Sequence, residues 1–147
     1  MARSRAMAAK DVQEMGLVLV PPGEYQLAFM GQETKYIFRS QKLYMHFRIV
    51  DFGPHFEKKV TRYYGVRIIG KPRKSGRFKA GWHSDLMTEY VSLFGRLPKR
   101  TSEIPITPYK KHILLGRVET VTNNRVRRPY PELLHYSRVA ELLRVVR

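Results

Sequence analysis

The chain has 147 residues, with 28 Lys and Arg against 12 Asp and Glu, so its formal net charge is +16 at pH 7. A hydrophobic fraction of 43% and an aromatic fraction of 12% are too high for a disordered polycation, so the composition indicates one folded basic domain. No apolar run approaches the roughly 20 residues that span a bilayer, so we expect no transmembrane helix, no cleaved signal and no membrane partner. The absence of cysteine excludes disulfides, thiolate zinc sites and a Cys nucleophile, and it fits a cytoplasmic protein.

The positive charge is clustered in one part of the chain. Residues 52–82 contain nine basic residues and one acidic residue, a net charge of +8 that is half of the total. A charge this large costs self-repulsion, so we expect an anionic partner, and nucleic acid is the leading candidate. The alternative is a uniformly solvated basic surface, which the clustering disfavours.

The first part of the chain combines a polar arm with a short strand pattern. Residues 1–15 lack a hydrophobic period, and we expect a mobile basic arm there, followed by a single domain over 16–147. Apolar residues alternate over 25–29, which predicts the first strand. Residues 31–34 are predicted to form a turn, and 36–38 a short extended piece.

The clearest alternation covers residues 43–50. One face carries Leu43, Met45, Phe47 and Ile49, and the opposite face carries Tyr44, His46 and Arg48. Strong turn residues follow at 51–54, and a third strand is predicted over 59–66. The three strands together are typical of a β-meander.

A basic loop and a helix follow the third strand. Residues 70–81 are rich in glycine and basic residues and contain no acid. Ser84 as N-cap, apolar residues at helical spacing and Gly95 as C-cap predict a helix over 85–94. A proline-rich connector then leads to a fourth strand over 112–121.

The last segment fits two structures. Val139, Leu142, Leu143 and Val146 match a helical stripe, whereas residues 136–146 could equally form an apolar strand, and periodicity slightly favours the helix. The order of elements predicts a mainly β fold with one helix between strands three and four. This order suits a five-stranded barrel of the OB type.

Basic and aromatic residues are interleaved over 67–82, as expected where cations follow phosphates and rings stack on bases. The candidate binding residues there are Arg67, Lys71, Arg73, Lys74, Arg77, Phe78, Lys79 and Trp82. Phe78 lies between two cations and is expected to be exposed. Trp82 fits a stacking position and a core position equally well.

Two further groups of candidates lie elsewhere. The polar strand face supplies Tyr44, His46 and Arg48. The next strand adds Arg62 and Tyr64, or alternatively Tyr63, because neighbouring residues point to opposite faces. The third group is Arg125, Arg127 and Arg128, in the loop that lies beside the binding groove of an OB barrel. The alternative for the strand residues is an ordinary exposed strand face, and the alternative for the three arginines is a solvated loop without a binding role.

Catalytic and metal-binding patterns are weak. The close His and carboxylate pairs are Asp51 with His55 and His83 with Asp85, and neither has a two-His metal spacing. We expect both aspartates to have structural roles, one in a turn and one at a helix start. No cofactor, metal or enzymatic activity is expected, and a metal-dependent nuclease centred on His83 and Asp85 is the remote alternative.

Three segments carry a resemblance to a known family. They are Pro22-Gly23-Glu24-Tyr25, which opens the first strand, the strand over 42–50, and Tyr136-Ser137-Arg138-Val139 near the end. Together they resemble the small OB-fold single-stranded-DNA-binding proteins of phages, plasmids and integrated mobile elements, over about residues 20–145. The resemblance implies that residues 136–143 form the closing strand rather than a helix. It also implies sequence-tolerant binding of single-stranded DNA in replication, recombination or transfer of DNA.

The resemblance has one clear departure and leaves two alternatives. Housekeeping bacterial members end in an acidic tip, whereas this chain ends in Leu-Arg-Val-Val-Arg, so its basic end could hold DNA or a homo-oligomer interface instead. An RNA-binding protein would use the same stacking and phosphate contacts. A basic interaction protein that binds an acidic protein partner is the alternative from another class.

Overall fold

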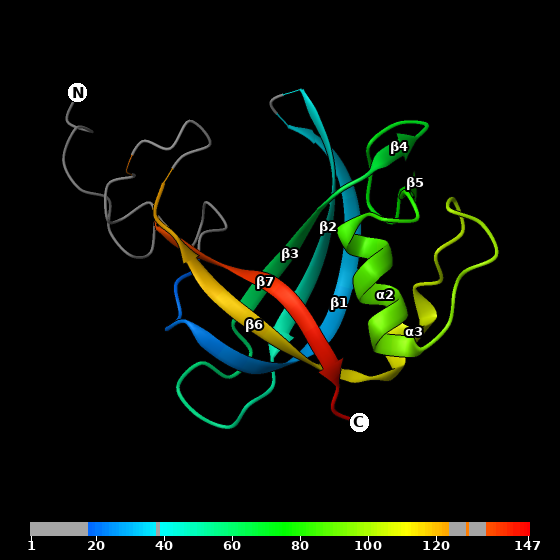
Figure 1. The fold of residues 1–147 in the computed structure, drawn as a ribbon. Coiled ribbons are helices and arrows are strands. Elements are labelled where there is room, and N and C mark those ends of the chain that lie inside the picture. The colour runs from blue at the N-terminus through cyan, green and yellow to red at the C-terminus, as the bar shows by residue number, and fades with distance from the viewer. Residues whose placement is uncertain (1–17, 38, 124–128, 130–134) are drawn as a thin grey trace, which may run out of the picture.

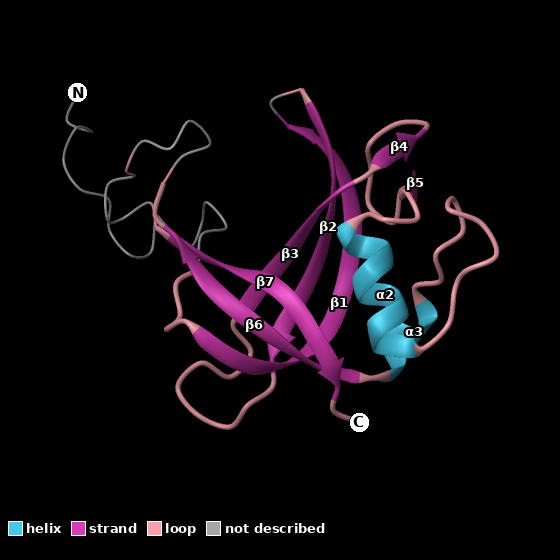
Figure 2. Cartoon of the chain, viewed as in Figure 1, coloured by secondary structure: helices cyan, strands magenta, loops and turns pink. Residues whose placement is uncertain are grey.

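The computed structural model describes residues 18–37, 39–123, 129 and 135–147. Its five long strands are β1 (Gly23–Ile37), β2 (Ser40–Ile49), β3 (Lys59–Gly65), β6 (Ile113–Val121) and β7 (Tyr136–Val145). Between β3 and β6 lie two short strands and two helices, namely β4 (Arg67–Ile69), β5 (Arg77–Lys79), α2 (Asp85–Phe94) and α3 (Thr107–Lys111), as Figures 1 and 2 show. The prediction of a mainly β protein is confirmed. No helix in the described part of the chain is long and apolar enough to span a membrane.

The five long strands are hydrogen-bonded in a closed ring, in the order β1, β2, β3, β7, β6 and back to β1. Strands β3 and β7 run parallel, whereas the other neighbours are antiparallel. The parallel contact is short, since its Cα register consists of Arg62 opposite Val139. The seam between β3 and β7 is therefore the weakest join of the ring.

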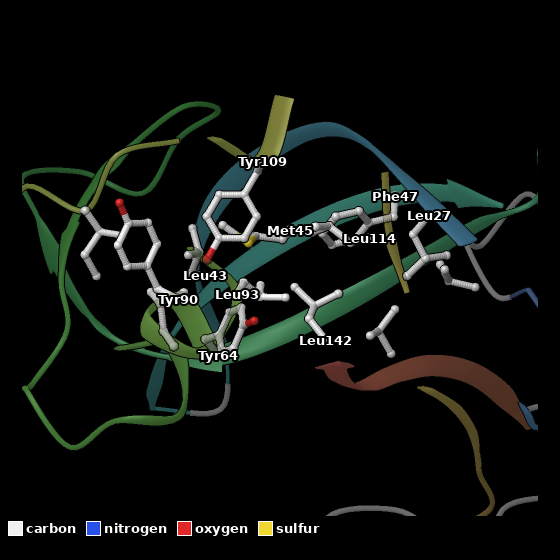
Figure 3. Close-up of a cluster of buried hydrophobic side chains, with 14 of the residues drawn as sticks. Leu27, Leu43, Met45, Phe47, Tyr64, Tyr90, Leu93, Tyr109, Leu114 and Leu142 are labelled. Atoms are coloured by element: carbon white, nitrogen blue, oxygen red, sulfur yellow. The ribbon is translucent and has the colours of Figure 1, made fainter. Parts of the chain in front are cut away.

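The inward residues of the ring form the hydrophobic core. The predicted alternation of β2 is confirmed, because Leu43, Met45, Phe47 and Ile49 are fully buried. They pack with apolar side chains from the other ring strands and from the two helices (Figure 3). The residues between them in β2 face outward and form part of the outer surface of the ring.

Strand β1 differs from its prediction. We expected a turn over 31–34, but the strand continues through this segment to Ile37. The pairing with β2 slips between Phe29 and Gly31, so Met30 bulges out and is 55% exposed. Gly31 has a φ of 155°, which side-chain-bearing residues rarely adopt, so the glycine forms a β-bulge rather than a turn.

The closing segment is a strand, and the helical interpretation of it is wrong. Val139 and Leu142 both point into the core, although they are three residues apart. The register with β6 shifts between Arg117 and Val118, so one extra residue of β7 is accommodated between those two inward positions. A bulge in a strand therefore produced the spacing that resembles a helix.

Helix α2 begins and ends at the predicted residues. Ser84 Oγ accepts the backbone N–H of Met87 at 3.2 Å, and Gly95 takes the left-handed C-cap conformation with a φ of 69°. The helix packs against β3 and β7 at one end of the ring, beside α3 (Figure 1). Helix α3 was not predicted within the proline-rich connector, and its Tyr109 packs edge-on against Phe94 of α2 with ring centroids 5.0 Å apart.

A buried carboxylate fastens α2 to the seam between β3 and β7. Glu89 on α2 forms an ion pair with Arg62 of β3 and accepts the Tyr64 hydroxyl at 2.7 Å. The same carboxylate accepts the backbone N–H of Leu142 in β7 at 3.1 Å. The Arg62 guanidinium also lies 4.3 Å from the centre of the Tyr64 ring. One side chain thus bonds to both strands of the short parallel contact.

We predict that Glu89→Leu destabilises the protein by about 3 to 5 kcal/mol, because it leaves the Arg62 charge buried without a partner. Urea unfolding measures the change. The matched control is Glu141→Gln, which breaks an exposed ion pair with Arg117 and should cost less than about 1 kcal/mol. Equal effects of the two substitutions would contradict a special role for Glu89.

Candidate nucleic-acid interface

The outer face of β2 and β3 carries a cluster that we name the aromatic face, formed by Tyr44, His46 and Tyr63. Tyr44 lies opposite Tyr63 in the strand register, and their rings meet edge to face with centroids 4.6 Å apart. Burial raises the pKa of Tyr63 to about 12, and the phenols of Tyr136 and Tyr44 add to the effect. The ring of Tyr63 is therefore packed among other tyrosines and stays neutral at physiological pH.

The prediction that Arg62 and Tyr64 of β3 join this face is wrong. Tyr64 is only 2% exposed and lies in the core, and Arg62 points inward to Glu89. The alternative, Tyr63, occupies the outer face instead. The two-residue period of a strand allowed only one of these sets, and the buried partner on α2 decided which one.

A charge network covers the end of the aromatic face nearest β1. Glu33 on β1 forms an ion pair with Lys35 at 3.0 Å and approaches His46 Nε2 at 3.6 Å. His46 Nδ1 lies 2.8 Å from the Thr61 hydroxyl. Although burial alone would raise it, the pKa of Glu33 is lowered by Lys35 and His46. The carboxylate is therefore ionised and its charge is compensated.

The pKa of His46 is lowered, first by burial and then by the positive charge of Lys59, against an opposing effect of Glu33. His46 is therefore predominantly neutral at neutral pH. Arg48, the third predicted residue of this strand face, forms an ion pair with Glu57 at 3.5 Å. The outer face of β2 is thus polar and aromatic with its cations partly neutralised.

Beside this sheet lies a segment that we name the basic hairpin, residues 67–79, formed by β4, β5 and their connection. Its predicted cations are all exposed, and they are Arg67, Lys71, Arg73, Lys74, Arg77 and Lys79. None of the six forms an ion pair with another described residue. The basic hairpin therefore presents uncompensated positive charge, unlike the sheet face.

The basic hairpin is held in place by hydrogen bonds to β1 and β2. Gln41 Oε1 accepts the Ile68 N–H at 2.7 Å. The Thr34 N–H donates to the Arg73 carbonyl at 3.0 Å, and the Ser75 N–H donates to the Gln32 carbonyl at 2.9 Å. The cations therefore lie on a segment that is fixed in place beside the end of β1 and the start of β2 (Figure 1).

The predicted exposure of Phe78 is wrong. Phe78 is 5% exposed and belongs to the core, while its neighbours Arg77 and Lys79 face the solvent. The segment that we expected to be a loop is a short strand at this point, so its side chains alternate between inside and outside. Phe78 therefore anchors the basic hairpin instead of stacking on a ligand.

Trp82 is exposed, at 48% of its surface, just after the basic hairpin. Of the two positions that fitted the sequence equally well, the core position is therefore wrong. Other exposed rings were not predicted as candidates. Phe52 and Phe56 lie in the turn between β2 and β3, at the opposite end of β2 from the hairpin, with ring centroids 6.4 Å apart.

Two groups of predicted residues lie outside the described residues. They are the arm over 1–15 and the cluster of Arg125, Arg127 and Arg128. The two aspartates that we expected to have structural roles lie within the described residues. Asp51 Oδ2 accepts the Gln26 N–H at 3.0 Å, and Asp85 occupies the first turn of α2. Within the described ranges, no group of three or more His, Asp or Glu side chains is arranged to hold a metal ion.

No protein-family model matches the chain, and neither the curated proteins nor the solved structures contain a match. The geometry places the aromatic face next to the basic hairpin. Hydrogen bonds hold this hairpin in place, and its cations form no ion pair with another described residue.

We predict that acid weakens folding through His46. Since the pKa of His46 is lower in the folded protein than the unfolded value of 6.5, its contribution to stability is complete above pH 6.5 and is lost as the pH falls through the folded pKa. Thermal unfolding between pH 7.5 and 5.5 should therefore show a smaller drop in Tm for His46→Gln than for the wild type. His83→Gln, at an exposed position, is the control, and an equal change in both variants would contradict the prediction.

Proposed function

We propose that the protein binds single-stranded DNA with little sequence preference and acts in replication, recombination or transfer of DNA. The proposal includes an OB-type barrel as the scaffold. Counted along the chain, the ring strands are arranged first, second, third, fifth and fourth, and α2 lies between the third and the fourth. This order and the position of the helix support the OB assignment.

The observation that carries the proposal is the juxtaposition of uncompensated cations and outward-facing rings. The basic hairpin would attract the phosphate backbone, because its exposed cations have no acidic partners among the described residues. Tyr44 and Tyr63 would stack on bases, which every base permits because each has a π-face. Trp82, exposed beside the hairpin, would extend the stacking surface.

Such an interface tolerates any base sequence. Phosphate contacts position a nucleic acid and carry no sequence information. Ring stacking adds affinity without reading hydrogen-bond donors or acceptors on the bases. Single strands would be favoured over duplexes, because only unpaired bases can lie flat on the aromatic face.

We predict that single-stranded DNA binds more tightly than duplex DNA and that salt weakens binding. If about five phosphates are neutralised, log affinity should fall with log salt with a slope of about −3.5, from roughly −0.7 per contact. Fluorescence anisotropy with labelled single-stranded DNA, duplex DNA and single-stranded RNA of one sequence measures both properties. Tighter binding of RNA would assign the interface to RNA. Equal, weak binding of all three that salt abolishes would overturn the proposal and favour an acidic protein partner.

We predict that Tyr44→Ala and Tyr63→Ala each weaken single-strand binding by about 1 to 3 kcal/mol, the usual contribution of one stacked base. Anisotropy titrations measure the loss, and thermal unfolding verifies that each variant folds. Phe52→Ala is the matched control, because Phe52 is a fully exposed ring at the opposite end of β2. An equal loss in all three variants would show that the aromatic face is not the stacking surface.

A further inference from the structure

A groove lies between the basic hairpin and the adjoining ends of β2 and β3. It has a volume of about 530 Å³. Its lining includes Ser40 and Lys42 from β2, Gly65 from β3, Arg67 from β4, Lys79 at the end of β5, and Gly81 in the loop that follows. The groove continues the aromatic face, because Lys42 and Gly65 form the next outward row after Tyr44 and Tyr63.

The charge of this groove is entirely positive. Lys42, Arg67 and Lys79 line it, and no acidic residue does. None of these three cations forms an ion pair within the part of the chain that the structure describes. Three cations around one hollow repel one another unless an anion enters it.

The strand register makes this arrangement costly. Lys42 lies directly opposite Lys35 of β1, and like charges in that position destabilise a sheet. Glu33 compensates Lys35, since the two side chains are 3.0 Å apart. The charge of Lys42 is left for the groove.

Two glycines keep the groove open. A Cβ atom placed on Gly65 or on Gly81 would meet nothing within 4 Å, and neither residue has a φ in the left-handed region. Their backbone conformation therefore does not require glycine. Glycine, which has no side chain, lets a ligand or another backbone approach closely.

The walls of the groove are fixed before any ligand arrives. Gln41 holds β4 on one side, through its side-chain oxygen to the Ile68 N–H and its carbonyl to the Val66 N–H at 3.2 Å. On the other side Ser84, the N-cap of α2, donates its hydroxyl to the Gly81 carbonyl at 2.8 Å. A preformed site reduces the entropy that binding must overcome.

We propose that this groove binds a backbone phosphate of the single strand and so leads the strand from the aromatic face onto the basic hairpin. The inference rests on the proposed function and assigns one of its phosphate contacts to a specific place. Lys42, Arg67 and Lys79 supply the positive charge. Gly65 and Gly81 supply the space for the sugar-phosphate chain.

The test compares two groove variants with a matched surface variant, by anisotropy titrations of single-stranded DNA over a series of salt concentrations. Lys42→Gln should weaken binding about fourfold at 0.15 M salt and make the salt slope less negative by about 0.7, as for one lost phosphate contact. Gly65→Leu fills the groove and should weaken binding by about the same fourfold, because it removes the same phosphate contact. Lys99→Gln, at an exposed position after α2, should bind as the wild type does.

The outcomes separate this inference from the proposed function. Salt-dependent wild-type binding with Lys42→Gln equal to Lys99→Gln would overturn the groove and leave the function standing. Wild-type protein that does not bind single strands would overturn both. Should thermal unfolding show that Gly65→Leu does not fold, Lys42→Gln decides alone.

A terminal phosphate is the other chemical source for the same contact. Oligomers with and without a 5′-phosphate should bind equally if the groove holds the backbone. Binding that requires the 5′-phosphate in the wild type and loses this requirement in Lys42→Gln would overturn the backbone assignment and place a strand end in the groove.

Discussion

The buried carboxylate of Glu89 joins α2 to both strands at the seam where the ring closes. Strands β3 and β7 meet in parallel over a very short register, so few backbone hydrogen bonds join them. Glu89 bonds Arg62 and Tyr64 on one strand and the Leu142 N–H on the other. A buried charge is tolerated only when it is paired and hydrogen-bonded. The position of α2, the contact between β3 and β7, and the choice of which β3 side chains face inward are therefore linked.

This seam has a consequence for the opposite side of β3. Because Arg62 and Tyr64 turn inward to Glu89, Tyr63 must turn outward, where it meets Tyr44. The acidic residues near that outer face are used as local partners, as Glu33 is for Lys35. Cations without an ion-pair partner among the described residues lie instead on the basic hairpin and around the groove at its base. The proposed interface thus separates the stacking surface from the phosphate-binding surface.

The parts of the fold that follow simple periods could be predicted from the sequence. The alternation of β2 and the capped helix α2 are local patterns, and both are confirmed. Two of the failures occurred at bulges, because an extra residue breaks the two-residue period without leaving a local signal. The bulge at Gly31 resembled a turn, and the bulge between Val139 and Leu142 resembled a helix.

The sequence by itself determined the class of fold, the excess of positive charge and its concentration over 52–82. Composition and short periods depend only on residues that are close together in the chain. Only the tertiary structure decided which face each residue occupies. Phe78 became an anchor and Trp82 an exposed ring, although both stand among cations in the sequence. Lys42 and Gly65, which no pattern singled out, came together across two strands. Contacts between strands depend on register, and register is set by the packing of the whole ring.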